Sequence, residues 1–233
     1  MSFSERLARF VMRHRVGFGV LILAVTAFFA TQIPKVRVVS ILTDLFPENH
    51  DFVEAYVEYQ DVFGGANAVI IDIEVKEGDI FNPGTLGKIR SITKELELLP
   101  GINNYQVLSL AQRKVKNITV DASAGFQAQP LMWPDIPQTP EEIERLRDLV
   151  HSGRAHGSLV SRDDKAALIL AGFFEEDLDP AQVYDRLDAL AREIEDDNTR
   201  VHVIGRPVML GFIQKNAPQL KWLFLATVLA MIL

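Results

Sequence analysis

An internal repeat constrains the fold of this chain more than any other feature. The apolar run at 68–75 (AVIIDIEV) is typical of a strand, and an acidic loop and the pair Asn82-Pro83 follow it. The same order returns at 166–173 (AALILAGF), before another acidic loop and the pair Asp179-Pro180. Asn and Asp are favoured N-caps, and proline suits the first helical position because its missing N–H has no intrahelical partner there. Each unit therefore predicts a strand followed by a helix.

A second strand completes each unit, at 102–110 and at 201–204. Two β-α-β units in succession predict the α+β class and a ferredoxin-like β-α-β-β-α-β domain, in which two helices cover one face of four strands. The segment between the units predicts a proline-punctuated loop at 124–138, a helix from Thr139-Pro140 to His151, and a hairpin from Leu159 into the second apolar run. An amphipathic helix over 50–63 precedes the first unit.

Both ends of the chain are apolar. The eighteen residues 16–33 contain no formal charge, and as a helix they would be about 27 Å long, close to the hydrocarbon thickness of a bilayer. This predicts a first transmembrane helix, with a cleaved signal peptide as the alternative. Residues 218–233 predict the start of a second transmembrane helix that is cut short, with a buried core helix as the alternative. We therefore expect the chain to be the front of a longer protein.

The charge distribution predicts an orientation in the membrane. Residues 1–15 hold four arginines and one glutamate, a net +3, whereas the remaining 20 Lys/Arg and 30 Asp/Glu give −10. Basic residues beside a first span hold that end in the cytoplasm, so 1–15 is predicted as a cytoplasmic tail and 34–217 as a periplasmic domain. The acidic pI near 5.3 argues against nucleic acid as a partner. The absence of cysteine excludes disulfides, thiol nucleophiles and iron–sulfur sites.

No motif for an enzyme is present, and we predict neither a catalytic, a cofactor nor a metal site. Phosphate-binding glycine loops and a nucleophile elbow are absent from the sequence. The histidines at 50, 151, 156 and 202 do not have the His-x-x-x-His spacing of a metal site. Acidic neighbours such as Asp163-Asp164 lie in turns, where solvated carboxylates are the usual case. The sequence therefore predicts a protein that is not an enzyme.

Two sets of residues are candidates for other roles. The first set comprises candidate joints between the domain and the membrane: Asp44, Pro47, Gly64, Gly65, Gly205 and Pro207. For Gly205-Arg206-Pro207 the alternative is an ordinary tight exit from a strand. The second set is a candidate hydrophobic path, for which core or interface packing is the alternative: Phe126, Met132, Trp133 and Phe212.

Taken together, the order of short motifs resembles the first half-repeat of the RND superfamily, near the MMPL-type and predicted-exporter branch. The resemblance covers essentially the whole chain. It begins with the basic tail and the first span, and it continues through these motifs: Asp44-Leu45-Phe46-Pro47, Phe63-Gly64-Gly65, VIIDIEV, Phe81-Asn82-Pro83, Leu99-Pro100-Gly101, Ser109-Leu110 and Gly205-Arg206-Pro207. It implies a twelve-helix bacterial inner-membrane exporter, in which proton flow through later helices drives export of lipids or other hydrophobic compounds. The implied partners are the bilayer, the remainder of the transporter, a hydrophobic substrate and, as a candidate, further copies in an oligomer.

Two other classes fit the same layout. A two-span sensor would have a periplasmic ligand-binding domain between its helices, and its topology would be identical up to residue 233. A membrane-anchored scaffold subunit is the third alternative. The resemblance implies proton-relay residues in later helices, outside this sequence. Residues 16–33 contain no ionisable side chain that could serve as a relay.

Overall fold

The computed structural model describes residues 10, 12–32, 50–63, 67–121, 125–174 and 178–232. The chain divides into two units, Met1–Ile41 and Leu42–Leu233, and each is considered by itself. The candidate joint residues Asp44, Pro47, Gly64 and Gly65 lie outside the described residues.

In the first unit, helix α2 (Arg15–Gln32) covers the predicted apolar segment. Seven of its large apolar side chains are exposed: Val16, Val20, Leu21, Ile22, Val25, Phe28 and Phe29. Within the part of the chain that the structure describes, no helix combines the length and the apolar character that crossing a membrane requires. The predicted membrane helices at 16–33 and 218–233 are not confirmed and stay predictions.

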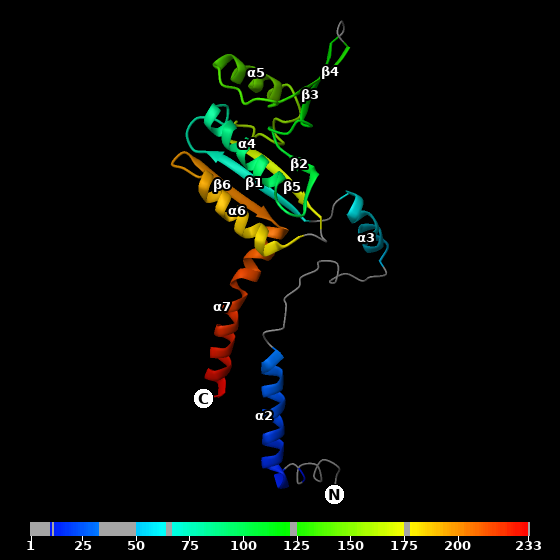
Figure 1. The fold of residues 1–233 in the computed structure, drawn as a ribbon, viewed down its shortest axis with the longest axis vertical. Coiled ribbons are helices and arrows are strands. Elements are labelled where there is room, and N and C mark those ends of the chain that lie inside the picture. Colours follow the sequence, from blue (N-terminus) through cyan, green and yellow to red (C-terminus); the bar gives the residue numbers. More distant parts are fainter. Residues whose placement is uncertain are drawn as a thin grey trace. The chain divides into compact units, whose positions relative to one another are not determined.

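The second unit has mixed α and β structure (Figure 1). Its elements follow in this order: α3 (Asp51–Phe63), β1 (Ala68–Val75), α4 (Pro83–Glu97), β2 (Ile102–Leu108), β3 (Lys116–Asp121), β4 (Gly125–Pro130), α5 (Pro140–His151), β5 (Ala166–Phe173), α6 (Pro180–Ile194), β6 (Thr199–Gly205) and α7 (Arg206–Ile232). The two strands of the predicted repeat are confirmed with their bounds unchanged, and the helix predicted over 50–63 is confirmed as α3.

Four strands form one sheet in the order β2-β5-β1-β6, and each neighbouring pair is antiparallel. The α+β class is confirmed. A second sheet pairs β3 with β4, where the sequence predicted a loop over 124–138, and that prediction was wrong for 125–130. The described side chains of β4 are exposed on both of its faces, apart from partly covered Pro130, so the strand has no apolar alternation that would predict it.

The helix starts follow the predicted caps. The Asn82 side chain accepts a hydrogen bond from the Thr85 amide, and the Asp179 carboxylate accepts from the amides of the first turn of α6. Thr139 and Glu142 form a reciprocal capping box at the start of α5. Each cap satisfies backbone donors that have no partner inside the helix.

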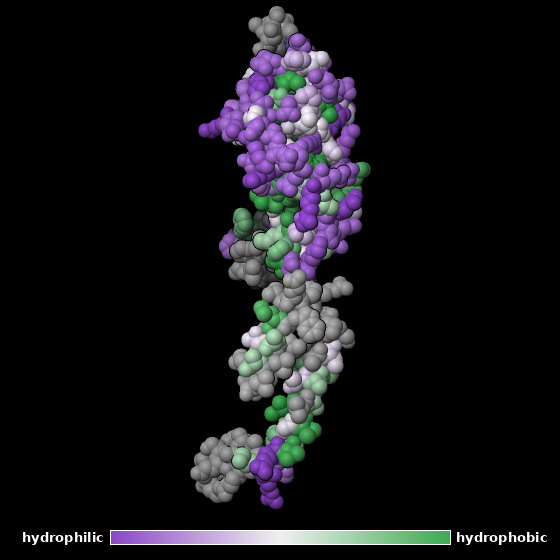
Figure 2. All heavy atoms as spheres, turned by 90° about the vertical axis from the view of Figure 1, so that its left-hand side faces the viewer, coloured by the Kyte–Doolittle hydropathy of each residue, from purple (hydrophilic) through white to green (hydrophobic). Residues whose placement is uncertain are grey.

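The core lies between one face of the four-stranded sheet and helices α4 and α6, which lie on the same side of it (Figure 1). The buried strand residues alternate along β1: Val69, Ile71, Ile73 and Val75. They pack with buried apolar residues of α4 and α6. The intervening residues of β1 face the other side of the sheet, which is less covered. On the side drawn in Figure 2, hydrophilic residues cover most of the part that holds the strands.

Candidate functional site

The less covered face of the sheet contains a pocket of about 390 Å³. Strands β1, β5 and β6 supply its floor, and the segment 157–161 supplies one wall. Its lining is mainly apolar, with one carboxylate and one imidazole: Ile70, Asp72, Gly157, Ser158, Val160, Ser161, Ala166, Leu168, His202 and Ile204. The antiparallel register explains this grouping, since Ile70 lies opposite Ile204 and Asp72 lies between Leu168 and His202. The pocket is therefore a property of the strand order.

Asp72 is the polar feature of this pocket. Its Oδ1 atom is buried and has no hydrogen-bond partner in the described part of the chain. Burial raises the pKa of the Asp72 carboxyl, His202 opposes that shift, and Glu74 adds to it. The imidazole Nε2 of His202 lies 3.3 Å from the Glu74 carboxylate. A buried carboxylate oxygen without a hydrogen-bond partner among the described residues makes the pocket suited to an apolar ligand that carries a cationic or hydrogen-bonding group.

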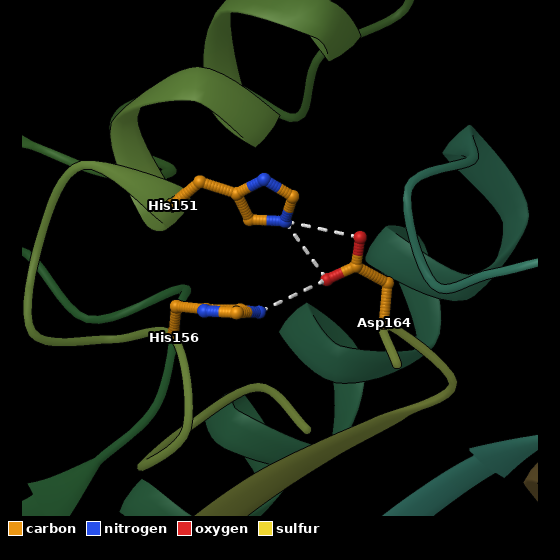
Figure 3. A group of neighbouring side chains, drawn as sticks. All are labelled: His151, His156 and Asp164. Atoms are coloured by element: carbon orange, nitrogen blue, oxygen red, sulfur yellow. Dashed lines mark hydrogen bonds and ion pairs between the residues drawn. The ribbon is translucent and has the colours of Figure 1, made fainter. Parts of the chain in front are cut away.

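A second site lies where α5 ends, and it combines His151, His156 and Asp164 (Figure 3). His151 is the last residue of α5, His156 follows in the next loop, and Asp164 lies in the turn before β5. The His151 Nε2 atom is 2.9 Å from Asp164 Oδ1, and the His156 Nε2 atom is 3.8 Å from the same oxygen. The three ligand-type atoms all lie within 4.8 Å of one another. Both imidazoles thus point at one carboxylate.

Asp164 is held in place by its backbone and by an arginine. Its φ of +59° is in the left-handed region, which Asp tolerates better than most residues. The Ile80 amide donates to the Asp164 carbonyl at 2.9 Å. Arg147 contacts Asp164 Oδ2 at 3.3 Å and Asp79 at 2.9 Å. Arg147 therefore contacts Oδ2 of Asp164, which His151 Nε2 also approaches at 3.0 Å, while Oδ1 lies toward both histidines.

The sequence did not predict this site, because His151 and His156 are five positions apart and fit no metal-site spacing on one helix. That rule does not apply here, since α5 ends at His151 and the chain turns back before His156. The two acidic neighbours at 163 and 164 also differ in their surroundings. Asp163 is solvated, and a hydrogen bond from the Ser161 hydroxyl lowers its pKa. Asp164, in contrast, has a side chain that is only 16% exposed.

The candidate joint at β6 and α7 is a point of close backbone contact. Gly205 has a φ of +143°, and a Cβ there would lie 2.3 Å from the Ala68 carbonyl oxygen. Pro207 is buried in the first turn of α7, and the Arg206 guanidinium contacts the Asn67 side chain at 3.2 Å. No residue separates β6 from α7. The tight exit is confirmed, and the coupling role stays a prediction.

The four residues of the candidate hydrophobic path occupy separate surroundings. Met132 is only 1% exposed, as the alternative of packing in the core predicts. Phe126 on β4 is 79% exposed, and Trp133 is 46% exposed beneath the guanidinium of Arg90. Phe212 on α7 lies with its ring centroid 6.0 Å from that of Tyr184 on α6. For Met132, packing in the core is the correct interpretation.

Comparisons with known proteins assign no family to the chain. No protein-family model matches the sequence, and no curated protein matches it. The functional argument therefore depends on the fold, the two sites and the apolar segments.

Proposed function

We propose that this chain is part of a proton-driven RND-type exporter of lipids or other hydrophobic compounds. It supplies the first membrane helix, at 16–33, and a periplasmic porter-like domain, at 34–217. The observation that carries the proposal is the strand order β2-β5-β1-β6, with one helix after β1 and another after β5. A ferredoxin-like β-α-β-β-α-β domain has this order, and the RND resemblance of the sequence implies such a domain.

The exit of the chain from the domain supports a mechanical role. Helix α7 continues directly from β6, and Gly211 lets it approach α6 closely. A Cβ at Gly211 would lie 2.1 Å from the Pro180 carbonyl oxygen. An ion pair between Lys215 and Asp185 also joins the two helices. A helix attached in this way would transmit its displacement to the domain, as an exporter requires.

The sheet-face pocket supports a hydrophobic cargo. Its volume of about 390 Å³ lies within the usual range for small-molecule sites, and apolar side chains dominate its lining. The side chains of Ile70, Leu168 and Ile204 would contact an acyl chain or another apolar group. Asp72 and His202 would provide the contacts with titratable side chains.

Membrane attachment is supported by the sequence at the N-terminal end. Large apolar side chains are exposed along α2 in its own unit, which is unfavourable in water unless a lipid or protein partner covers them. Four arginines in residues 1–15 would hold that end on the cytoplasmic side. Proton transfer would use ionisable groups in other helices of the exporter.

The test is efflux of a fluorescent apolar dye from cells of the source bacterium that carry or lack the gene. We expect deletion to raise dye retention and the wild-type gene to restore efflux, unless a protonophore is present. Leu168→Glu places a charge in the pocket and should abolish restoration. Ile118→Glu, at an exposed position of β3, is the matched control and should restore efflux. Retention that is unchanged by deletion would contradict export and favour the sensor.

A further inference from the structure

We propose that His151, His156 and Asp164 bind a divalent transition-metal ion, with zinc as the expected ion. This proposal depends only on described side chains of the second unit and is independent of the export proposal. Two imidazole nitrogens and a carboxylate oxygen form one of the ligand sets that zinc takes in proteins. Three protein ligands leave a fourth position for water.

The distances fit an ion without a change of backbone. In a tetrahedral zinc site with bonds of about 2.0–2.1 Å, neighbouring ligand atoms are about 3.3 Å apart. Here Asp164 Oδ1 lies 2.9 Å from His151 Nε2 and 3.8 Å from His156 Nε2. These two values lie on either side of the ideal spacing, and all three ligand-type atoms lie within 4.8 Å of one another, so side-chain rotations would bring them to an ion.

The surroundings of the three ligands resemble the outer shell of a metal site. A ligating carboxylate is usually hydrogen-bonded through its remaining lone pairs, which orients it. Arg147 does this for Asp164, because its guanidinium donates to Oδ2, and Oδ1 lies toward both histidines; His151 Nε2 is also 3.0 Å from Oδ2. Phe81 packs against the ring of His151, with its centroid 6.0 Å away, and restricts the orientation of that imidazole.

The local charge also favours a cation. Arg147 contributes one positive charge, and it contacts three carboxylates, those of Asp79, Glu144 and Asp164. With neutral histidines the group carries a net charge of −2, which a divalent ion would neutralise. The His151 side chain is 40% exposed, so an ion can enter from solvent.

A bound ion would connect three segments that are separate in the chain: the end of α5, the loop at 156 and the turn that enters β5. This would fix the β3–β4–α5 insertion to the main sheet. The ion would stabilise the folded state, since the ligand atoms converge only there.

The experiment is titration of the metal-free full chain with zinc chloride by calorimetry, followed by thermal unfolding with and without zinc. We expect one zinc ion per chain and a higher unfolding temperature with zinc. Asp164→Asn keeps a residue that tolerates positive φ, and it should weaken binding at least about tenfold. His156→Gln should have the same effect. His202→Gln, outside the cluster, is the matched control and should bind as the wild type does.

A visible absorption spectrum with cobalt in place of zinc adds a direct reading of the ligand set, and its bands should weaken in His156→Gln. Absence of zinc binding in the wild type would overturn the proposal. Equal affinity in wild type and His156→Gln would also overturn it, as would an equal loss in His202→Gln. If Asp164→Asn fails to fold, the zinc affinity of His156→Gln relative to the wild type tests the proposal alone.

Discussion

Replacement of Gly205 by alanine is the sharpest test of the packing between β6 and β1. Gly205 pairs with Val69 in the sheet and has a φ of +143°. An added Cβ would lie 2.3 Å from the Ala68 carbonyl oxygen and 2.9 Å from the Val69 Cα. Both neighbours are backbone atoms of a central strand, so they cannot rotate away as a side chain does. The strands must separate locally to admit the methyl group.

Two costs add at this position. A side chain in a glycine-type conformation costs about 1–3 kcal/mol, and overpacking against rigid neighbours costs about 1–3 kcal/mol. We therefore expect Gly205→Ala to lower the free energy of unfolding by about 4 kcal/mol. For a domain of this size that corresponds to a fall of about 8–16 °C in unfolding temperature.

The measurement is thermal unfolding of the purified protein by circular dichroism, with Gly78→Ala as the matched control. Gly78 also has a positive φ, of +82°, but a Cβ there would meet nothing within 4 Å. The control therefore measures the conformational cost alone, and we expect it to lose about half as much stability. If Gly205→Ala loses no more stability than Gly78→Ala, the inference that Gly205 is in rigid contact with β1 is wrong.

Three further changes test other parts of the domain. Thr139→Ala removes the capping box of α5 and should cost about 1 kcal/mol in chemical denaturation, while Thr139→Ser should retain most of it; equal losses would contradict the capping role. The pKa of Asp196 is lowered to about 2, chiefly by the Lys88 side chain, so its stabilising effect is complete above its ordinary pKa and is lost as the pH falls toward about 2. Lys88→Met should raise that pKa in a carboxyl NMR titration, and an unchanged value would refute the ion pair. Burial raises the pKa of Asp72, so its ionised form opposes folding at neutral pH; Asp72→Asn should raise the unfolding temperature at pH 7, and the gain should disappear at pH 3. A gain that is equal at both pH values would show that charge is not the cause.

The fold was predictable where the local sequence signals and the pattern of buried residues indicate the same element. The caps at Asn82, Thr139 and Asp179 mark helix starts in the sequence, and the structure places the helices there. The run at 68–75 is a strand because alternate residues face the helices. The β3–β4 hairpin was not predictable, because backbone pairing forms it and the described residues of β4 bury little apolar surface.

The candidate sites show a sharper limit of sequence reasoning. The pocket on the sheet face requires the strand order, since His202 of β6 and Leu168 of β5 come together only across Asp72 of β1, beside the pair Ile70 and Ile204. The histidine cluster requires the end of α5 and the turn at Asp164, both of which bring residues together by reversing the chain. Spacing rules assume one continuous helix or strand, and neither site lies on one element. The useful signal would have been the coincidence of a helix end, two histidines and an acidic turn within fourteen residues.

Gly205 at the end of β6 and Gly211 in α7 connect the pocket to the helix through close backbone contacts. Gly205 brings the end of β6 against β1, and Gly211 brings α7 against α6. The end of β6 is therefore fixed against β1, and the first turns of α7 are fixed against α6, largely by contacts with backbone atoms, which deform less readily than side-chain contacts. Because β6 and β1 both line the pocket and are in close contact at Gly205, a displacement of α7 would pass to both strands and change their position relative to β5. A ligand that prefers one width of the pocket would in turn favour one position of α7, since such coupling is reciprocal.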